Sequence, residues 1–167
     1  MKRILVIGCP GSGKTTFSKK LSQKLNIDCV HLDKMFWKEG WEMCSRDEFD
    51  IMLKEELQKE EWIIDGNYSR TLPLRLVRAD TVIFFNYSRI LCLFRVLKRV
   101  IKNYGVTRSD MGNGCPERFD MEFMKYVWTF KKKECDKIVT SLAEQKDINV
   151  ITINNKREYK DVEKLLL

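Results

Sequence analysis

Residues 8–16 read GCPGSGKTT, and this short stretch decides the fold. It satisfies the pattern G-x-x-x-x-G-K-[ST] through Gly8, Gly13, Lys14 and Thr15. Glycines let the backbone curl so that successive N–H groups converge on phosphate oxygens, and the following helix adds positive potential at its N-terminus. A strand-like run precedes the loop and an amphipathic pattern follows it. The stretch therefore predicts a phosphate-binding loop.

The loop motif also predicts a role for each of its residues. Lys14 is expected to reach the β- and γ-phosphates of a nucleoside triphosphate, and the Thr15 hydroxyl to bind Mg²⁺. The residues expected to contact the nucleotide are Gly8, Pro10, Gly11, Ser12, Gly13, Lys14, Thr15 and Thr16.

Short apolar runs alternate with helical patterns along the chain, which is typical of a parallel sheet covered by helices on both faces. The expected strands are Arg3–Ile7, Asp28–Leu32, Trp62–Ile64, Thr81–Asn86 and Asn149–Ile153. We therefore predict an α/β protein with the three-layer P-loop NTPase fold. Its five-stranded parallel sheet should have the order 2-3-1-4-5, within a single domain of residues 1–167.

Helical patterns fill the segments between these strands. Ser45 opens a capping box, and Ser88 precedes a helix expected to bury one apolar stripe. The stripe residues are Ile90, Leu93, Phe94, Leu97 and Ile101. Further helices are expected over Lys14–Leu25, Asp120–Ala143 and Glu158–Leu166. The least patterned segment, residues 103–118, holds three of the eight glycines and is predicted to be a short lid.

Two acidic residues follow predicted strands, at the sheet edge where ligands collect in open parallel sheets. Asp65 follows an apolar run, as expected of a residue that holds Mg²⁺ through water. Asp33 could accept a proton or a hydrogen bond from an acceptor hydroxyl. Either acid alone could instead cap its strand. His31 is interpreted as a packed strand residue rather than a catalyst.

Several arginines are placed to stabilise a phosphate in transfer. Arg95 and Arg99 lie four residues apart on one helix and can aim at one place. Arg70 follows Asp65 closely, and Arg108 and Arg118 bracket the glycine-rich segment. The alternative is a solvated basic face.

Composition restricts the class of protein. Hydrophobic residues make up 44% and charged residues 33%, which is ordinary for a globular domain, and no apolar run approaches the ~20 residues that cross a bilayer. Six cysteines without a C-x-x-C pair indicate free thiols in a reducing cytoplasm rather than a zinc site. The net charge of +7 favours anionic partners, and phosphorylated small molecules satisfy it as well as nucleic acid does.

Together these residues resemble the adenylate-kinase-like branch of P-loop kinases, and most closely its small bacterial DNA topology-modulation (FlaR-like) group. The resemblance covers nearly the whole chain. It rests on GCPGSGKTTFSKKL, HLDKMFWKEGW, WIIDGNYSRTLPLRLVRAD, CLFRVLKR and CPER.

This resemblance implies ATP as the phosphoryl donor. It matches Asp65 to a magnesium-shell aspartate and Arg70 to a phosphate-binding arginine, although the turn between them has one extra residue. It matches Arg95 and Arg99 to the paired arginines that open the adenylate kinase lid. The adenine-contacting loop would fall at Asn154–Arg157, with Asn155 and Arg157 as contacts.

The chain also departs from adenylate kinase. It has no four-cysteine zinc lid, and residues 34–60, on the expected acceptor side, do not reproduce the pocket for a nucleoside monophosphate. AMP as acceptor therefore does not follow. Trp37 and Trp41 either stack on a flat acceptor or fill a small subsidiary core.

The leading hypothesis is a Mg²⁺- and ATP-dependent kinase acting on a small molecule, such as a nucleotide or nucleoside-like acceptor. An alternative is a nucleotide-dependent DNA-binding protein without kinase activity, but the basic residues scatter among acidic ones. A GTPase-like switch fits poorly, because Asp65-Gly66 is not D-x-x-G and residues 155–158 only half match N-K-x-D.

Overall fold

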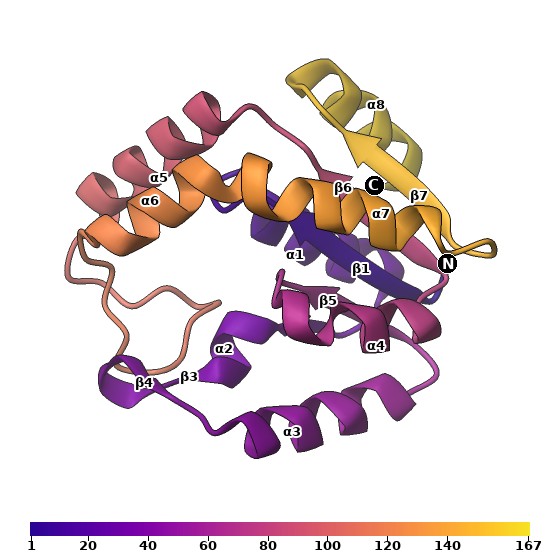
Figure 1. Ribbon diagram of the computed structural model, residues 1–167, viewed down its shortest axis with the longest axis horizontal. Coiled ribbons are helices and arrows are strands. Elements are labelled where there is room, and N and C mark those ends of the chain that lie inside the picture. Colours follow the sequence, from indigo (N-terminus) through magenta and orange to yellow (C-terminus); the bar gives the residue numbers. More distant parts are fainter.

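The computed structural model describes residues 1–167 as a parallel sheet enclosed by helices (Figure 1). The sheet strands are β1 (Arg3–Gly8), β2 (Cys29–His31), β5 (Trp62–Asp65), β6 (Thr81–Phe85) and β7 (Asn149–Ile153). They lie in the order β2-β5-β1-β6-β7, and every neighbouring pair is parallel. The predicted strand order is therefore confirmed.

All the helices expected from the sequence are present, together with two short ones, over residues 32–36 and 72–78, that were not predicted. They are α1 (Lys14–Leu25), α2 (Leu32–Phe36), α3 (Arg46–Gln58), α4 (Leu72–Arg78), α5 (Arg89–Asn103), α6 (Met121–Phe130), α7 (Asp136–Ala143) and α8 (Lys156–Leu166). The Ser45 side chain accepts a hydrogen bond from the Glu48 N–H and so starts α3 as predicted. No helix combines the length and the apolar character that crossing a membrane requires.

Helices cover both faces of the sheet (Figure 1). On one face α1 packs against α8, where the Phe17 and Tyr159 rings lie 5.8 Å apart. On the other face lie α4 and the long helix of residues 121–143. The strands β1, β5 and β6 are buried along almost their whole length, which is why they are continuous apolar runs rather than alternating ones.

The helix α5 follows its cap Ser88 as predicted, and the prediction of its buried face is right only in part. Leu93 and Leu97 are partly buried and pack against the core. The fully buried residues are Cys92, Val96 and Val100, whereas Ile90, Phe94 and Ile101 are 68%, 63% and 81% exposed, respectively. Close packing on the phosphate loop explains the difference: a Cβ atom at Gly11 would lie 2.6 Å from the Cys92 carbonyl oxygen. Small side chains permit this approach and large aliphatic ones do not. In this orientation of α5, Arg95 donates to the Ser12 carbonyl of the loop, and Arg99 lines the cavity.

The predicted helix over residues 120–143 is present, interrupted by a π-helical turn at Lys131–Cys135. Asp120 caps it by accepting a hydrogen bond from the Phe123 N–H. Lys131, Lys132 and Lys133 are exposed on this turn, while Glu134 and Lys137 line the main cavity. The π turn thus changes the side chains that the helix presents to the cavity.

Residues 34–60 and residues 103–118 contact each other. The first segment contains the short hairpin of β3 (Trp37–Lys38) and β4 (Glu42–Met43). The second runs from the end of α5 down to this hairpin (Figure 1). Gly40 N–H donates to the Gly114 carbonyl at 3.1 Å, and Trp41 Nε1–H donates to the Pro116 carbonyl at 3.2 Å. These contacts close one side of the cavity described next.

Candidate active site

The strand β1 leads directly into the phosphate loop. Gly8, the last residue of the strand, has a φ of +134°, and a Cβ atom there would lie 2.2 Å from the Phe85 carbonyl oxygen, so only glycine fits. Lys14 Nζ donates to the Cys9 carbonyl at 3.1 Å and therefore lies over the loop. The first turn of α1 contains no acidic residue, which leaves the positive potential of its N-terminus uncompensated.

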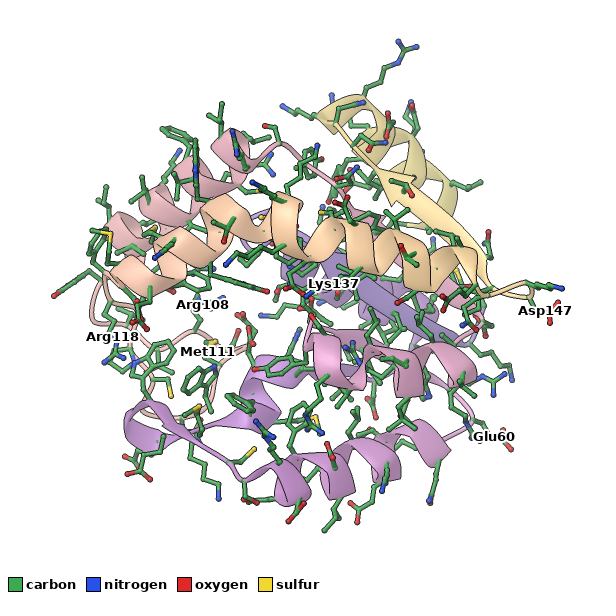
Figure 2. The ribbon with its side chains drawn as sticks, viewed as in Figure 1. Glu60, Arg108, Met111, Arg118, Lys137 and Asp147 are labelled. Carbon is green, nitrogen blue, oxygen red and sulfur yellow. The ribbon has the colours of Figure 1, made fainter.

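One cavity of about 700 Å³ brings most of the predicted residues together. The predicted residues that line it are Pro10, Gly11, Gly13, Lys14, Thr15, Thr16, Asp33, Trp37, Trp41, Asp65, Arg95, Arg99, Arg108 and Arg118. Figure 2 shows Arg108 and Met111 of the 103–118 segment and Lys137 of α7 around this central region, whereas Glu60 and Asp147 lie at the periphery. Gly8 and Ser12 belong to the loop but do not line the cavity.

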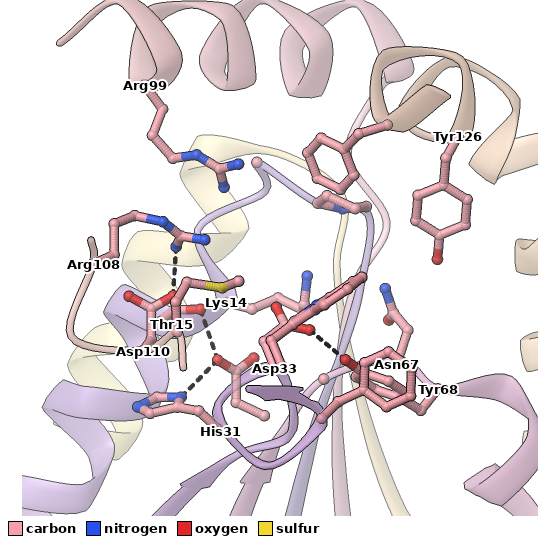
Figure 3. A pocket seen from close by; sticks show the side chains of 18 of the residues that line it. Lys14, Thr15, His31, Asp33, Asn67, Tyr68, Arg99, Arg108, Asp110 and Tyr126 are labelled. Atoms are coloured by element: carbon pink, nitrogen blue, oxygen red, sulfur yellow. Dashed lines mark hydrogen bonds and ion pairs between the residues drawn. The ribbon is translucent and has the colours of Figure 1, made fainter. Parts of the chain in front are cut away.

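In the cavity, Thr15 and Asp65 contact each other, and Figure 3 shows Thr15 and His31 on the same side of it. Thr15 Oγ1 donates to Asp65 Oδ2 at 2.7 Å, and His31 Nδ1 lies 3.1 Å from the same oxygen. Asp65 Oδ1 is buried and has no hydrogen-bond partner. A carboxylate oxygen without a partner next to a hydroxyl is a donor set that suits Mg²⁺, which prefers oxygen ligands. The interpretation of His31 as a packed strand residue missed its contact with Asp65. The two residues lie opposite each other because β2 and β5 pair in parallel with His31 in register with Asp65.

Asp33 lies in the first turn of α2 and faces the cavity near Lys14 (Figure 3). Tyr68 Oη–H donates to Asp33 Oδ1 at 2.9 Å. Desolvation by the surrounding protein raises the pKa of Asp33, and the Tyr68 hydrogen bond opposes that rise. The charges of Lys14 and Arg108 lower the same pKa, and the charge of Asp65 raises it further. Asp33 is thus a carboxylate with an increased tendency to take up a proton.

The turn that carries Tyr68 is held by a buried arginine that the sequence did not single out. Tyr68 has a φ of +37°, an unusual conformation for a residue other than glycine. The fully buried Arg75 donates to the carbonyl groups of Gly66, Asn67 and Tyr68. Asn67 Oδ1 accepts from the Gly8 N–H at 2.9 Å. The turn is therefore fixed to the phosphate loop, and with it the position of the Tyr68 hydroxyl.

Acidic residues hold the arginines at the top of the cavity. Glu117, only 7% exposed, accepts from Arg99 at 2.9 and 3.1 Å and from Arg108 Nε at 2.9 Å. Arg108 also donates to Asp110 at 2.5 Å. Sequence reasoning singled out the two arginines but missed both acids, although Glu117 lies within the CPER stretch at residues 115–118.

The other two arginines of the cavity contact aromatic rings. Arg95 donates to the Ser12 carbonyl at 3.0 Å and lies over the Tyr87 ring at 5.0 Å. Arg118 lies over the Trp41 ring, also at 5.0 Å. The Trp37 and Trp41 rings pack edge to face, 5.4 Å apart, and both line the cavity.

Three predicted residues lie away from the cavity. Arg70 forms two hydrogen bonds with Asp50 of α3, at 2.6 and 2.8 Å, because the 3₁₀ turn Ser69–Thr71 turns it outward. Asn155 caps α8 by accepting from the N–H groups of Arg157 and Glu158. The Arg157 side chain is exposed. The expectation that Arg70 faces the phosphates is therefore corrected, and an adenine contact for Asn155 and Arg157 stays a prediction.

Comparisons with known proteins point to P-loop kinases. A family model described as "AAA domain" matches residues 4–110. The L-seryl-tRNA(Sec) kinase of Methanococcus maripaludis is 31% identical over 140 residues, which are 75% of this chain and 55% of that protein. The shikimate kinase of Corynebacterium jeikeium is 32% identical over 99 residues, which are 52% of this chain and 54% of that protein. The chain spans about half the length of the curated relatives it matches.

A solved structure has the same fold over almost the whole chain. The crystal structure of shikimate kinase from Bacteroides thetaiotaomicron matches with a TM-score of 0.57 and 18% sequence identity. The match covers 98% of this chain and 95% of that one. At this identity the likeness shows the fold alone.

Proposed function

Because the chain belongs to the AAA-domain family, we propose that it acts on a nucleotide as a Mg²⁺-dependent kinase. In this reaction the γ-phosphate of ATP is transferred to a small-molecule acceptor. The observation that carries the proposal is a single cavity lined by the phosphate loop, by Asp33 close to Lys14, and by aromatic side chains on the acceptor side. The names of two relatives, both kinases, support it.

In this proposal the phosphate end binds and orients the donor. Lys14 and the loop N–H groups hold the β- and γ-phosphates. Thr15 and Asp65 would hold Mg²⁺, which when bound neutralises charge on the phosphate oxygens. Arg95 and Arg99 stabilise the charge that develops on the transferred group. Asn155 and Arg157 are proposed to approach the adenine.

The other segments define the acceptor side within one domain, residues 1–167. Residues 34–60 form its wall and residues 103–118 its lid, which excludes water while the phosphate moves. Asp33 contacts the acceptor, either as a hydrogen-bond acceptor or as a base. All six cysteines are unpaired, which supports a reducing compartment such as the cytoplasm.

The resemblance to the topology-modulation group suggests an alternative, a DNA-binding protein. The charged surface supports this alternative less than it supports the kinase. Basic side chains pair with acidic neighbours, as in Lys20 with Glu163 at 2.6 Å and Lys38 with Glu48 at 2.7 Å. Such pairs leave less positive charge for a phosphate backbone. DNA binding that falls steeply with salt would favour the alternative.

The experiment that tests the proposal uses γ-labelled ATP, Mg²⁺ and a small-metabolite extract, with an RNA fraction in a parallel reaction. A new labelled compound should form with the wild-type protein and be absent with Asp33→Asn. If the label stays on ATP or appears only as free phosphate in every reaction, the proposed function is wrong.

A further inference from the structure

The acceptor end of the cavity is poorly equipped to bind a phosphate. Besides Asp33, its charged side chains are Arg118, Asp120, Glu134 and Lys137, so acids outnumber bases there. Arg118 is stacked on Trp41. Lys137 is 71% exposed and lies 3.7 Å from Glu134. A phosphate monoester carries about −1.5 to −2 charges and is typically bound by several basic groups with arginine forks among them, whereas this end offers one arginine, Arg118, and the exposed Lys137.

The arginines nearer the phosphate loop are already engaged by acids or by carbonyl groups. Arg99 and Arg108 share Glu117. Arg108 also contacts Asp110, and Arg95 is bonded to the Ser12 carbonyl. In the cavity lining as a whole, acidic side chains are as numerous as basic ones. This equal number of acidic and basic side chains suits the phosphates of the nucleotide donor alone better than those of a donor and a phosphorylated acceptor together.

Asp33 has the chemistry that an alcohol acceptor needs. An alcohol must lose its hydroxyl proton when its oxygen attacks phosphorus, and a positioned carboxylate can take that proton. A phosphate monoester, with a second pKa near 6, is already ionised at neutral pH and needs no base. Tyr68 occupies Oδ1 of Asp33, which leaves Oδ2 for the acceptor.

The same end of the cavity is walled by aromatic rings. They belong to Phe36, Trp37, Trp41, Tyr68, Phe123 and Tyr126. Figure 3 shows Tyr68 and Tyr126 on the side of the cavity opposite Arg108 and Asp110. Such walls favour a flat ring, which packs against them over a large apolar area.

Given the proposed kinase function, we infer that the acceptor is a flat-ringed alcohol without a phosphate of its own, such as a nucleoside, and not a nucleoside monophosphate. A bond forms between the acceptor hydroxyl oxygen and the γ-phosphorus of ATP. The bond from that phosphorus to the β–γ bridging oxygen breaks, and its electron pair leaves on ADP. The hydroxyl proton passes to Asp33 Oδ2. The product is a phosphomonoester.

The test divides a bacterial small-metabolite extract into two halves, one of which is treated with alkaline phosphatase that is then removed by filtration. Each half is incubated with γ-labelled ATP, Mg²⁺ and the wild-type protein, and the linkage of the labelled phosphorus is determined by ³¹P NMR and mass spectrometry. Asp33→Asn is the inactive variant, and Asp50→Asn, outside the cavity, is its matched control.

The inference predicts a labelled phosphomonoester of a ring compound in both halves, with phosphatase treatment leaving the yield equal or higher. A phosphoanhydride product, a product without a ring, or a loss of labelling of tenfold or more after phosphatase treatment would overturn the inference and leave the kinase standing. If neither half yields a labelled compound, the proposed kinase function fails and the inference fails with it.

Discussion

The two ends of the cavity are built in different ways. The phosphate loop itself comes from one contiguous stretch, residues 8–16, and its glycines permit the conformation of its backbone. The acceptor end is assembled from distant segments: Tyr68 bonds to Asp33 across 35 positions, and Trp41 bonds to Pro116 across 75. The phosphate loop is therefore a local property of the chain, whereas the acceptor side depends on the folded topology.

The largest effect is expected from Lys14→Ala, which removes the lysine of the phosphate loop. ATP at a hundredfold excess over its Kd should stabilise the wild-type protein by about 2.7 kcal/mol, and the variant should lose this shift. Thermal melting with and without ATP measures it. Lys24→Ala, at the exposed end of the same helix, is the control. An unchanged ATP-induced shift would contradict the role of Lys14.

Asp33→Asn changes only the acceptor end. Removal of a base lowers transfer by ~10²–10⁴-fold, whereas ATP affinity should stay within a factor of about two because Asp33 lies outside the phosphate loop. Label transfer and isothermal titration measure the two quantities. An equal loss of ATP affinity would place Asp33 at the metal instead and remove the distinction between the two ends.

Glu117→Gln tests how the lid segment is held. Glu117 is the buried partner of both Arg99 and Arg108, so its neutralisation leaves two partly buried guanidinium groups without full compensation. We expect the free energy of unfolding to fall by about 3 kcal/mol in urea denaturation. Glu122→Gln, on the exposed first turn of α6, should leave it unchanged. Equal stability of the two variants would show that this network contributes nothing.

Tyr68→Phe should produce a smaller effect with a defined pH dependence. The Tyr68 hydroxyl lowers the pKa of Asp33, so its removal lets desolvation and the Asp65 charge raise that pKa against the opposing charges of Lys14 and Arg108. A base acts only when it is deprotonated. The acid limb of the pH–rate profile should therefore move to higher pH, and transfer above that limb should fall about tenfold or less.

The control for Tyr68→Phe is Tyr104→Phe, because Tyr104 is 70% exposed. Its pH profile should match that of the wild-type protein. If Tyr68→Phe leaves the acid limb in place, Asp33 is not the titrating base.

The smallest effect is expected from Arg70→Ala. Arg70 pairs with Asp50 on the surface of α3, away from the phosphates. Transfer and ATP affinity should be indistinguishable from those of the wild-type protein in steady-state assays. A tenfold or greater loss of transfer would restore the phosphate-binding role that the resemblance to adenylate kinase assigned to this residue.

The sequence predicted the phosphate loop more completely than it predicted the residues that depend on the folded topology. Strand order and the loop were predictable because a parallel α/β chain with a phosphate loop permits few arrangements. The fully buried positions of α5 were not, because its close contact with Gly11 places Cys92 and Val96, rather than the larger apolar side chains, against the loop. Arg75 and Glu117 were missed because their partners are backbone carbonyls and arginines that only the fold brings near.

The most direct test of the account measures ATP affinity and label transfer in parallel for the wild-type protein, Lys14→Ala and Asp33→Asn. The account predicts that Lys14→Ala loses both quantities and that Asp33→Asn loses transfer alone. If Asp33→Asn loses ATP affinity together with transfer, or keeps full transfer, then the cavity does not divide into a donor end and an acceptor end.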